Sequence, residues 1–338
     1  MRGLVTIFGG SGFVGSQIVR ALAKRGARIR VAVRRPWQAY RLRLLGDVGQ
    51  IEIVQANVRV PATVDAALEG AEGVVYSVGT LFESGRQDFA ALQAEGPASV
   101  AQSAARGGVT RFVLISAIGA DAHSPSKYAH TKAEGEAAVR AAIPSATILR
   151  PSIVFGQGDG FFTRFAELAL VSPVLPLIGG GATAFQPVFV ADVARAAALA
   201  LADPTAAGVT FELGGPTVYS FRQLMEIMLG VIGRQRLLLP VPWGLASLIG
   251  AMGDAQGYMR APLPMLPPPQ LTSDQVKLLR VDNVAAAGAP GLAALGVTPQ
   301  ALEPIIPTYL YPFRKGGQYA DLEPPPEAPG QRYAPDIV

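Results

Sequence analysis

The first half of the chain alternates short apolar runs with longer stretches in which apolar residues recur at helical spacing. Such runs are typical of strands buried on both faces of a parallel sheet, and the longer stretches are typical of the helices that cover it. The predicted strands are 4–8, 28–33, 51–58, 73–79, 111–116 and 146–150, and the predicted helices lie at 62–68, at 87–106, from about 126, and after the first strand. This order predicts an α/β fold, a doubly wound parallel sheet of Rossmann type.

The pattern becomes irregular after Pro151. The predicted elements there are a helix over 161–170, a strand over 185–190, a helix that starts near 191, and a strand over 209–213. Asp192 lies close to the N-cap of the helix near 191. The strand at 209–213 could rejoin the main sheet.

Composition divides the chain into three predicted parts. A Rossmann domain covers 1–155, and a smaller, mostly helical region covers 156–315. Residues 216–315 are Pro-rich and contain a stiff, extended link at 267–269. The Pro-rich tail, 316–338, has no hydrophobic period, so it is expected either to fray or to wrap a partner.

Bulk properties exclude several classes of protein. With 338 residues, of which 50% are hydrophobic, the chain can bury a large core. The most apolar segment, 237–252, is interrupted by Pro240 and Pro242, so we expect no transmembrane helix. The first strand starts directly after Arg2, so we expect no targeting peptide and a cytoplasmic location. The absence of cysteine and the presence of only 2 histidines argue against a metal site.

Charge adds little to this picture. The net charge is +4, and most of the 29 basic residues are arginines. Arginine favours planar contacts with phosphates and carboxylates, although a general composition bias explains its abundance equally well. Since no long basic run or RNP-type aromatic motif occurs, we expect no nucleic-acid partner.

A glycine-rich turn follows the first predicted strand and carries the main candidate chemistry. It consists of Gly9, Gly10, Ser11, Gly12, Phe13, Val14 and Gly15. The glycines fit both G-x-G-x-x-G and G-x-x-G-x-x-G, which allow a tight turn and a close approach of the backbone to a pyrophosphate. The following helix supplies free N–H groups and a partial positive charge. This arrangement predicts a dinucleotide cradle.

The end of the second predicted strand bears on which dinucleotide is bound. An NAD-selective site places an acidic residue there, whereas Arg34 and Arg35 suit a 2′-phosphate, so we predict NADP(H). The alternative is a pair of solvated arginines. Further cofactor contacts are predicted at the ends of the third and fourth strands, from Asn57, Val58, Ser77, Val78 and Gly79.

A second motif, Tyr128-x-x-x-Lys132, lies on the helix after the fifth predicted strand. Its spacing places both side chains on one helix face, where a lysine favours the phenolate and can hold the nicotinamide ribose. The order of a glycine turn followed, after the fifth strand, by this motif resembles the extended or atypical branch of the short-chain dehydrogenase/reductase superfamily. The resemblance covers roughly residues 1–215. The resemblance implies that Tyr128 is the general acid/base and that Lys132 supports it. It also implies that Ser116 orients the substrate and that Pro151 and Ser152 line the nicotinamide, although Ala117 and Ile118 follow Ser116 where further hydroxyls often occur.

Later segments resemble a narrower family. They are Phe155-Gly-Gln-Gly-Asp-Gly-Phe161, Gln186-Pro-Val-Phe-Val-Ala-Asp-Val193, and Leu295-Gly-Val-Thr-Pro299 followed by Leu302-Glu303. Together they are similar to the accessory subunit of respiratory complex I that has a short-chain dehydrogenase fold, in a bacterial form. The resemblance implies tightly bound NADPH, a structural or regulatory role, and a place on the hydrophilic arm near the membrane junction, beside other subunits of the complex.

Three functions are therefore carried forward. The first is a non-catalytic NADPH-binding subunit of complex I, peripheral to the inner membrane. The second is a free NADP-dependent reductase, epimerase or dehydratase that uses Tyr128 and Lys132, with Ser116 vestigial or active. The third is a regulator that senses the NADP/NADPH ratio. Leu237, Leu238, Leu239, Trp243, Leu245 and Leu248 could bury against partners, but we interpret them as ordinary core.

Overall fold

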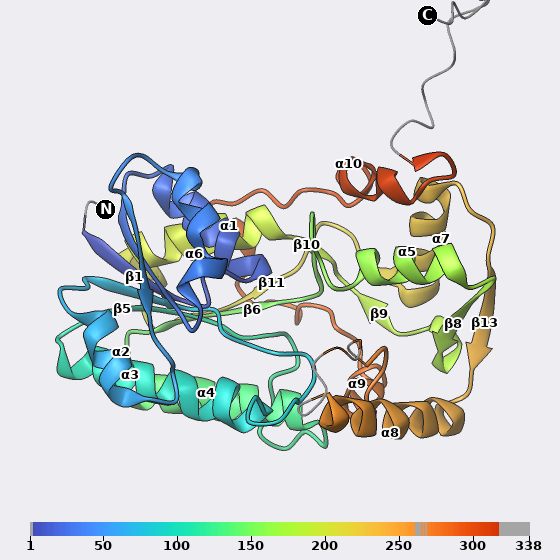
Figure 1. Cartoon of the computed structure of the whole chain (residues 1–338), viewed down its shortest axis with the longest axis horizontal. Helices are drawn as coiled ribbons and strands as arrows, with labels where there is room; N and C mark the ends of the chain where they lie inside the picture. The colour runs from blue at the N-terminus through green and yellow to red at the C-terminus, as the bar shows by residue number, and fades with distance from the viewer. Residues whose placement is uncertain (1–2, 261–264, 266, 268, 318–338) are drawn as a thin grey trace, which may run out of the picture.

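The computed structural model describes residues 3–260, 265, 267 and 269–317. Its central element is a seven-stranded sheet in which neighbouring strands are all parallel, in the order β11-β6-β5-β4-β1-β2-β3 (Figure 1). The strands are β1 (Leu4–Phe8), β2 (Arg28–Val33), β3 (Ile51–Gln55), β4 (Gly73–Tyr76), β5 (Arg111–Ile115), β6 (Thr147–Pro151) and β11 (Thr210–Leu213). The predicted doubly wound α/β fold is confirmed.

Helices cover both faces of this sheet, as the apolar strands require (Figure 1). One face packs against α1 (Phe13–Ala23) and α6 (Val190–Ala202). The other face packs against α2 (Pro61–Leu68), α3 (Gly96–Arg106) and α4 (Lys127–Ala142). The strand order reverses between β1 and β4, and α/β proteins bind ligands at the carboxyl ends of strands beside such a reversal. The glycine turn after β1 lies at this point.

Segments beyond residue 155 complete the sheet. β11 pairs with β6 along the edge, with Thr210 opposite Ile148. Helix α6 begins after Phe189, and Asp192 lies buried in its first turn. The Asp192 carboxylate accepts a hydrogen bond from the Gln300 backbone N–H at 2.8 Å, so it ties a distant loop to the helix.

A second core lies beside the sheet and is built from residues 153–313. Its two-stranded sheets are β7 (Val154–Phe155) with β10 (Val188–Phe189), β9 (Ala184–Phe185) with β12 (Tyr219–Ser220), and β8 (Val174–Ile178) with β13 (Leu237–Val241). Its helices are α5 (Phe162–Val171), α7 (Phe221–Ile232) and α10 (Ile306–Leu310), while α8 (Trp243–Met259) and α9 (Ser273–Leu278) form a further layer below them (Figure 1).

The structure differs from several of the predicted elements. The predicted strand 185–190 is divided between the short strands β9 and β10, and its last residue, Val190, begins α6. The predicted helix 87–106 consists of a π-helix, Ala90–Glu95, followed by α3, because Pro97 has no N–H to continue the α-helical ladder. The predicted helical region also contains the strand β13. Pro268 and the predicted tail beyond residue 317 lie outside the described residues.

The interpretation of the six apolar residues between 237 and 248 as ordinary core is wrong for four of them, whereas Leu238 and Trp243 are half-buried and pack against the core. Leu237 is 63% exposed and Leu248 is 61% exposed, with Leu239 and Leu245 near one half. None of the helices in the described part of the chain has both the length and the apolar character needed to cross a bilayer.

Candidate functional site

The glycine turn packs so tightly that side chains cannot replace two of its glycines. Gly9 has a φ of +82°, and a Cβ placed on it would lie 2.8 Å from the carbonyl carbon of Ser77. A Cβ on Gly15 would lie 2.2 Å from the carbonyl oxygen of Gly9. The turn thus brings the N-terminus of α1 directly against the ends of β1 and β4, which is the close approach that a dinucleotide cradle needs.

The open side of this turn faces solvent. Ser11 and Gly12 are exposed, and Gly12 is the N-cap of α1, whose first turn comprises Phe13, Val14, Gly15 and Ser16. Their N–H groups lie at the positive end of the helix, and none of the four residues carries a negative charge. The backbone of this turn therefore fits a pyrophosphate group.

The end of β4 connects the glycine turn to the predicted tyrosine–lysine pair. The Ser77 hydroxyl donates a hydrogen bond to the Phe8 carbonyl at 3.0 Å, and Val78 follows it half-buried. A Cβ on Gly79 would lie 3.8 Å from Nζ of Lys132. The structure thus brings 77–79 beside both parts of the predicted site.

Arginines gather where β2 and β3 end. Arg34 and Arg35 follow β2 and are exposed. Partial burial lowers the pKa of Arg34, and the charges of Arg35 and Arg59 lower it further, so the three guanidinium groups share one region. Such a cluster of like charges suits an anion with two negative charges, such as a 2′-phosphate.

Arg59 is missed by the sequence analysis, although its position carried a signal. It lies four residues after the end of β3, Arg34 directly follows the end of β2, and the two strands are neighbours. Its guanidinium donates to the Arg86 carbonyl at 2.7 Å. Asn57 and Val58 precede it, and the Asn57 side-chain oxygen accepts from the Arg59 backbone N–H at 3.2 Å. That oxygen is therefore engaged in a turn, and Val58 is buried in the core.

Helix α4 carries both Tyr128 and Lys132. Ser126 caps the helix, and its hydroxyl accepts a hydrogen bond from the Ala129 N–H. The Tyr128 ring meets Phe89 edge to face, with 5.8 Å between ring centroids. Nζ of Lys132 lies 5.8 Å from the Tyr128 ring centroid and donates to the Ile115 carbonyl at 3.1 Å.

The protonation of this pair differs from the expectation. Burial raises the pKa of Tyr128 to about 12, and the charge of Asp274 adds to the rise. Burial also lowers the pKa of Lys132 to about 8, against an opposing effect of Glu136. The expected lowering of the Tyr128 pKa by Lys132 is therefore wrong, because the cost of burying a phenolate exceeds the attraction of an ammonium over the ring face.

The pKa of Lys132 predicts how stability depends on pH. Between its folded pKa of about 8 and the ordinary value of 10.5, the unfolded state binds more protons, so the free energy of unfolding should rise with pH. The titration of Tyr128 opposes this only above its ordinary value of 10.0. Chemical denaturation from pH 8 upward should show the rise in the wild type and its loss in Lys132→Met. Lys127→Met, at an exposed position of the same helix, should keep it; equal slopes in all three proteins would contradict the prediction.

Ser116 is held by charged groups. Its hydroxyl donates to Oε1 of Glu136 at 2.5 Å, and Arg150 donates to both oxygens of the same carboxylate, at 2.9 and 2.6 Å. Glu212 lies 3.5 Å from the Arg150 guanidinium, and Glu136 is 8% exposed. The sequence analysis missed Glu136, although it follows Lys132 by one helical turn on α4. Because the Ser116 hydroxyl donates its hydrogen bond to this carboxylate, it has a structural partner and is not free to donate to a substrate.

Ser152 is bound by a segment far along the chain. Its hydroxyl makes hydrogen bonds to the side-chain oxygen and the carbonyl of Asn283, at 2.7 and 2.8 Å. The Asn283 amide donates to the Ile118 carbonyl at 3.3 Å. Pro151, the last residue of β6, accepts a hydrogen bond from the Ile118 N–H. Asn283 therefore bridges the carboxyl ends of β5 and β6, where the nicotinamide contacts were predicted.

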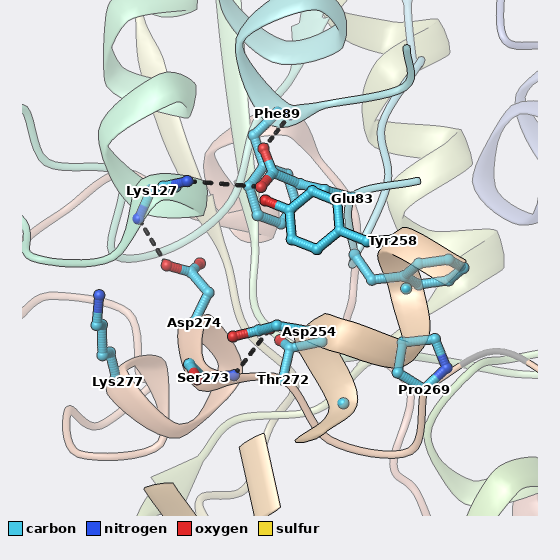
Figure 2. A pocket seen from close by; sticks show the side chains of 13 residues that line it. Glu83, Phe89, Lys127, Asp254, Tyr258, Pro269, Thr272, Ser273, Asp274 and Lys277 are labelled. Atoms are coloured by element: carbon cyan, nitrogen blue, oxygen red, sulfur yellow. Dashed lines mark hydrogen bonds and ion pairs between the residues drawn. The ribbon is translucent and has the colours of Figure 1, made fainter. Parts of the chain in front are cut away.

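Asp274 holds the start of the tyrosine helix (Figure 2). Its carboxylate accepts from the backbone N–H groups of Lys127 and Tyr128, at 2.7 and 3.0 Å, and from the Ser126 hydroxyl at 2.8 Å. A cavity of about 120 Å³ opens beside it, between Phe89 and α8. Its lining includes Glu83, Lys127, Asp254, Tyr258, Asp274 and Lys277. The second part of the chain thus encloses the tyrosine helix on its N-terminal side.

The fold and this site define a class of protein: a Rossmann-type α/β protein with a glycine-rich turn after β1 and a tyrosine and a lysine four residues apart on α4. The chain belongs to the NAD dependent epimerase/dehydratase family, whose model matches residues 5–214. Subunit 9 of the NADH dehydrogenase [ubiquinone] 1 alpha subcomplex of Arabidopsis thaliana mitochondria is 35% identical, over 93% of this chain and 79% of the relative. A ceramide reductase of Caulobacter vibrioides is 33% identical, over 75% of this chain and 78% of the relative.

Solved structures agree on the fold. The NADPH-dependent quinone oxidoreductase of Escherichia coli, in complex with NADPH, has a TM-score of 0.68 at 22% sequence identity. The match covers 89% of this chain and 98% of that one. This likeness shows the fold alone.

Proposed function

We propose that this chain is a non-catalytic accessory subunit of respiratory complex I. The observation that carries the proposal is the identity to mitochondrial NADH dehydrogenase subunits along 93% of the chain, beyond the part that the family model matches. The protein acts beside other subunits of the complex, on its hydrophilic arm near the membrane junction. It is cytoplasmic and is held at the inner membrane through the complex.

The site supports a structural role better than turnover. The hydroxyl of Ser116 is engaged by Glu136, and the raised pKa of Tyr128 keeps its phenol protonated near neutral pH. Proton transfer is most effective when the pKa lies near the operating pH, so this pair is poorly matched to acid–base chemistry.

NADPH is the proposed ligand. The glycine turn would hold its pyrophosphate, the arginines after β2 and β3 its 2′-phosphate, and Lys132 its nicotinamide ribose. The other proposed contacts are Asn57, Val58, Ser77, Val78, Gly79, Ser116, Tyr128, Pro151 and Ser152. A ligand that binds only the folded state stabilises it by about 4 kcal/mol at a thousandfold excess over Kd, so a bound nucleotide can support the fold of a subunit.

The test is purification of native complex I from the source organism, followed by mass spectrometry of the intact particle. We expect this polypeptide and one bound NADP(H) in the same particle. A complete, active complex without this chain would refute the assignment, and a complex whose copy of this chain carries NAD(H) would refute the choice of nucleotide.

Arg34 tests nucleotide selectivity. Hydrogen bonds to charged groups contribute about 1.5–3 kcal/mol, so Arg34→Ala should weaken NADPH binding by about tenfold to a hundredfold. Binding of NADH, which has no 2′-phosphate, should stay unchanged. Titration calorimetry with both nucleotides measures the two values, and Arg20→Ala, an exposed arginine on α1, is the control. Equal loss for NADPH and NADH would mean that Arg34 does not contact the 2′-phosphate.

A second candidate is a free NADP-dependent reductase, epimerase or dehydratase. It is favoured by the presence of Tyr128 and Lys132 on one face of α4 and by the identity to a ceramide reductase. The assay is NADPH oxidation with the isolated protein against carbonyl compounds, nucleotide sugars and ceramides. Turnover that Tyr128→Phe abolishes would establish this function, and absence of turnover across the panel would dismiss it.

A further inference from the structure

Helix α8 directs its large apolar side chains outward. Leu248 is 61% exposed, Met252 68% and Met259 55%. With Leu245 and Ile249, also exposed, these residues form what we call the α8 face. The helix lies at the lower edge of the molecule, with α9 above it (Figure 1). A helix that is apolar on most sides is ordinarily buried on most sides.

The inward side of α8 consists of small residues. Ala246, Gly250, Gly253 and Gly257 are buried. A Cβ on Gly250 would lie 2.8 Å from the Ser273 nitrogen, and one on Gly253 would meet the Leu271 carbonyl oxygen at 1.8 Å. The helix backbone is therefore pressed onto residues 271–273. Because only glycine fits at this contact, the orientation of α8 is fixed and the α8 face cannot turn inward.

Polar groups of α8 are engaged within the chain. The Ser247 hydroxyl donates to the Trp243 carbonyl, the Gln256 amide donates to the Pro267 carbonyl, and Asp254 accepts from the Ser273 N–H. A protein–protein interface carries about one hydrogen bond per 100–200 Å². Because these polar side chains already bond within the chain, α8 offers few hydrogen-bonding groups to a protein partner.

Positive charge flanks the α8 face at both ends. Arg260 is the C-cap of α8, and the Arg280 guanidinium lies 5.1 Å from the ring centroid of Trp243, the first residue of the helix. Asp254 is the sole acidic residue between 237 and 260. β13, which leads into α8, adds the exposed side chains of Leu237 and Leu239.

We propose that α8 lies flat on the surface of a lipid bilayer that contains anionic headgroups. The α8 face enters the boundary between headgroups and acyl chains, and the arginines at the two helix ends remain at headgroup level. Tyr258, which is 60% exposed, lies near the C-terminal end of the helix, and tyrosine side chains favour the membrane interface. This contact goes beyond the proposed function, since it is made by the chain itself and not through another subunit.

Vesicle flotation with the full chain tests the proposal. Wild-type protein should float with vesicles of phosphatidylcholine and phosphatidylglycerol, and less with phosphatidylcholine alone. Leu248→Glu with Met252→Glu should reduce the partition coefficient by at least about tenfold, since each lost methylene contact weakens partition. The matched control, Leu44→Glu with Val48→Glu, changes two side chains that are 86% and 107% exposed elsewhere and should float like the wild type.

A fluorescent label separates lipid contact from protein contact. The chain has no cysteine, so Met252→Cys and Val48→Cys each give one labelling position. A dye that reports polarity should shift to the blue at position 252, and not at 48, when anionic vesicles are added. Flotation that survives the glutamate substitutions would overturn the proposal. So would a blue shift at 252 that grows with protein concentration without vesicles, since that would identify a second copy as the occupant.

Discussion

Replacement of Gly15 by alanine should abolish nucleotide binding. The added Cβ would lie 2.2 Å from the Gly9 carbonyl oxygen and 2.8 Å from the Gly10 Cα, and both contacts are with backbone. Since a backbone cannot rotate away as a side chain can, the turn must move off the N-terminus of α1. We expect at least about a hundredfold rise in the Kd for NADPH, equivalent to the loss of about two charge-assisted hydrogen bonds. Titration calorimetry with the purified variant measures this.

Gly230→Ala is the matched control for this substitution. Gly230 lies inside α7, its φ is negative, and a Cβ placed there meets nothing within 4 Å. Alanine is favoured over glycine inside helices by about 0.5–1 kcal/mol, so this variant should be slightly more stable and should bind NADPH normally. Wild-type affinity in a folded Gly15→Ala protein would show that the turn does not hold the nucleotide.

Local sequence signals predicted the sheet and the glycine turn. The apolar run of β1, the glycines after it and the helical spacing of Ile18, Val19 and Leu22 all lie within about two dozen residues of one another. In a doubly wound fold such short units are repeated in chain order, so their local pattern determines most of the architecture. The start of α4 near residue 126 was predicted for the same reason.

Contacts between distant parts of the chain were not predictable in this way. Asp274 caps a helix that begins almost 150 positions earlier, and Asn283 bridges the ends of β5 and β6. Neither residue has a local partner that reveals its role. The outward direction of α8 was missed because its apolar composition suits a core, whereas the Gly250 and Gly253 contacts that turn the apolar side outward depend on residues 271–273.

Removal of the Glu136 carboxylate should cause the largest loss of stability. Glu136→Ala takes both hydrogen bonds from the Arg150 guanidinium and leaves the buried Ser116 hydroxyl without its acceptor. Loss of one partner from a buried ion pair costs about 3–5 kcal/mol. Glu212 lies 3.5 Å from the Arg150 guanidinium and still offsets part of its positive charge in this variant. We therefore expect the free energy of unfolding to fall by about 3 kcal/mol. Urea denaturation without nucleotide measures the change.

Two further variants assign this loss to its cause. Glu136→Gln keeps an acceptor for Ser116 but removes the charge that faces Arg150, so its stability should lie between those of the wild type and Glu136→Ala. Glu134→Ala removes an exposed carboxylate from the same helix, where it pairs with an exposed His130 at 3.3 Å, and should change stability by less than about 1 kcal/mol. If Glu136→Ala and Glu134→Ala were equally stable, the network would contribute nothing to the fold, and a free Ser116 hydroxyl would again support the reductase function.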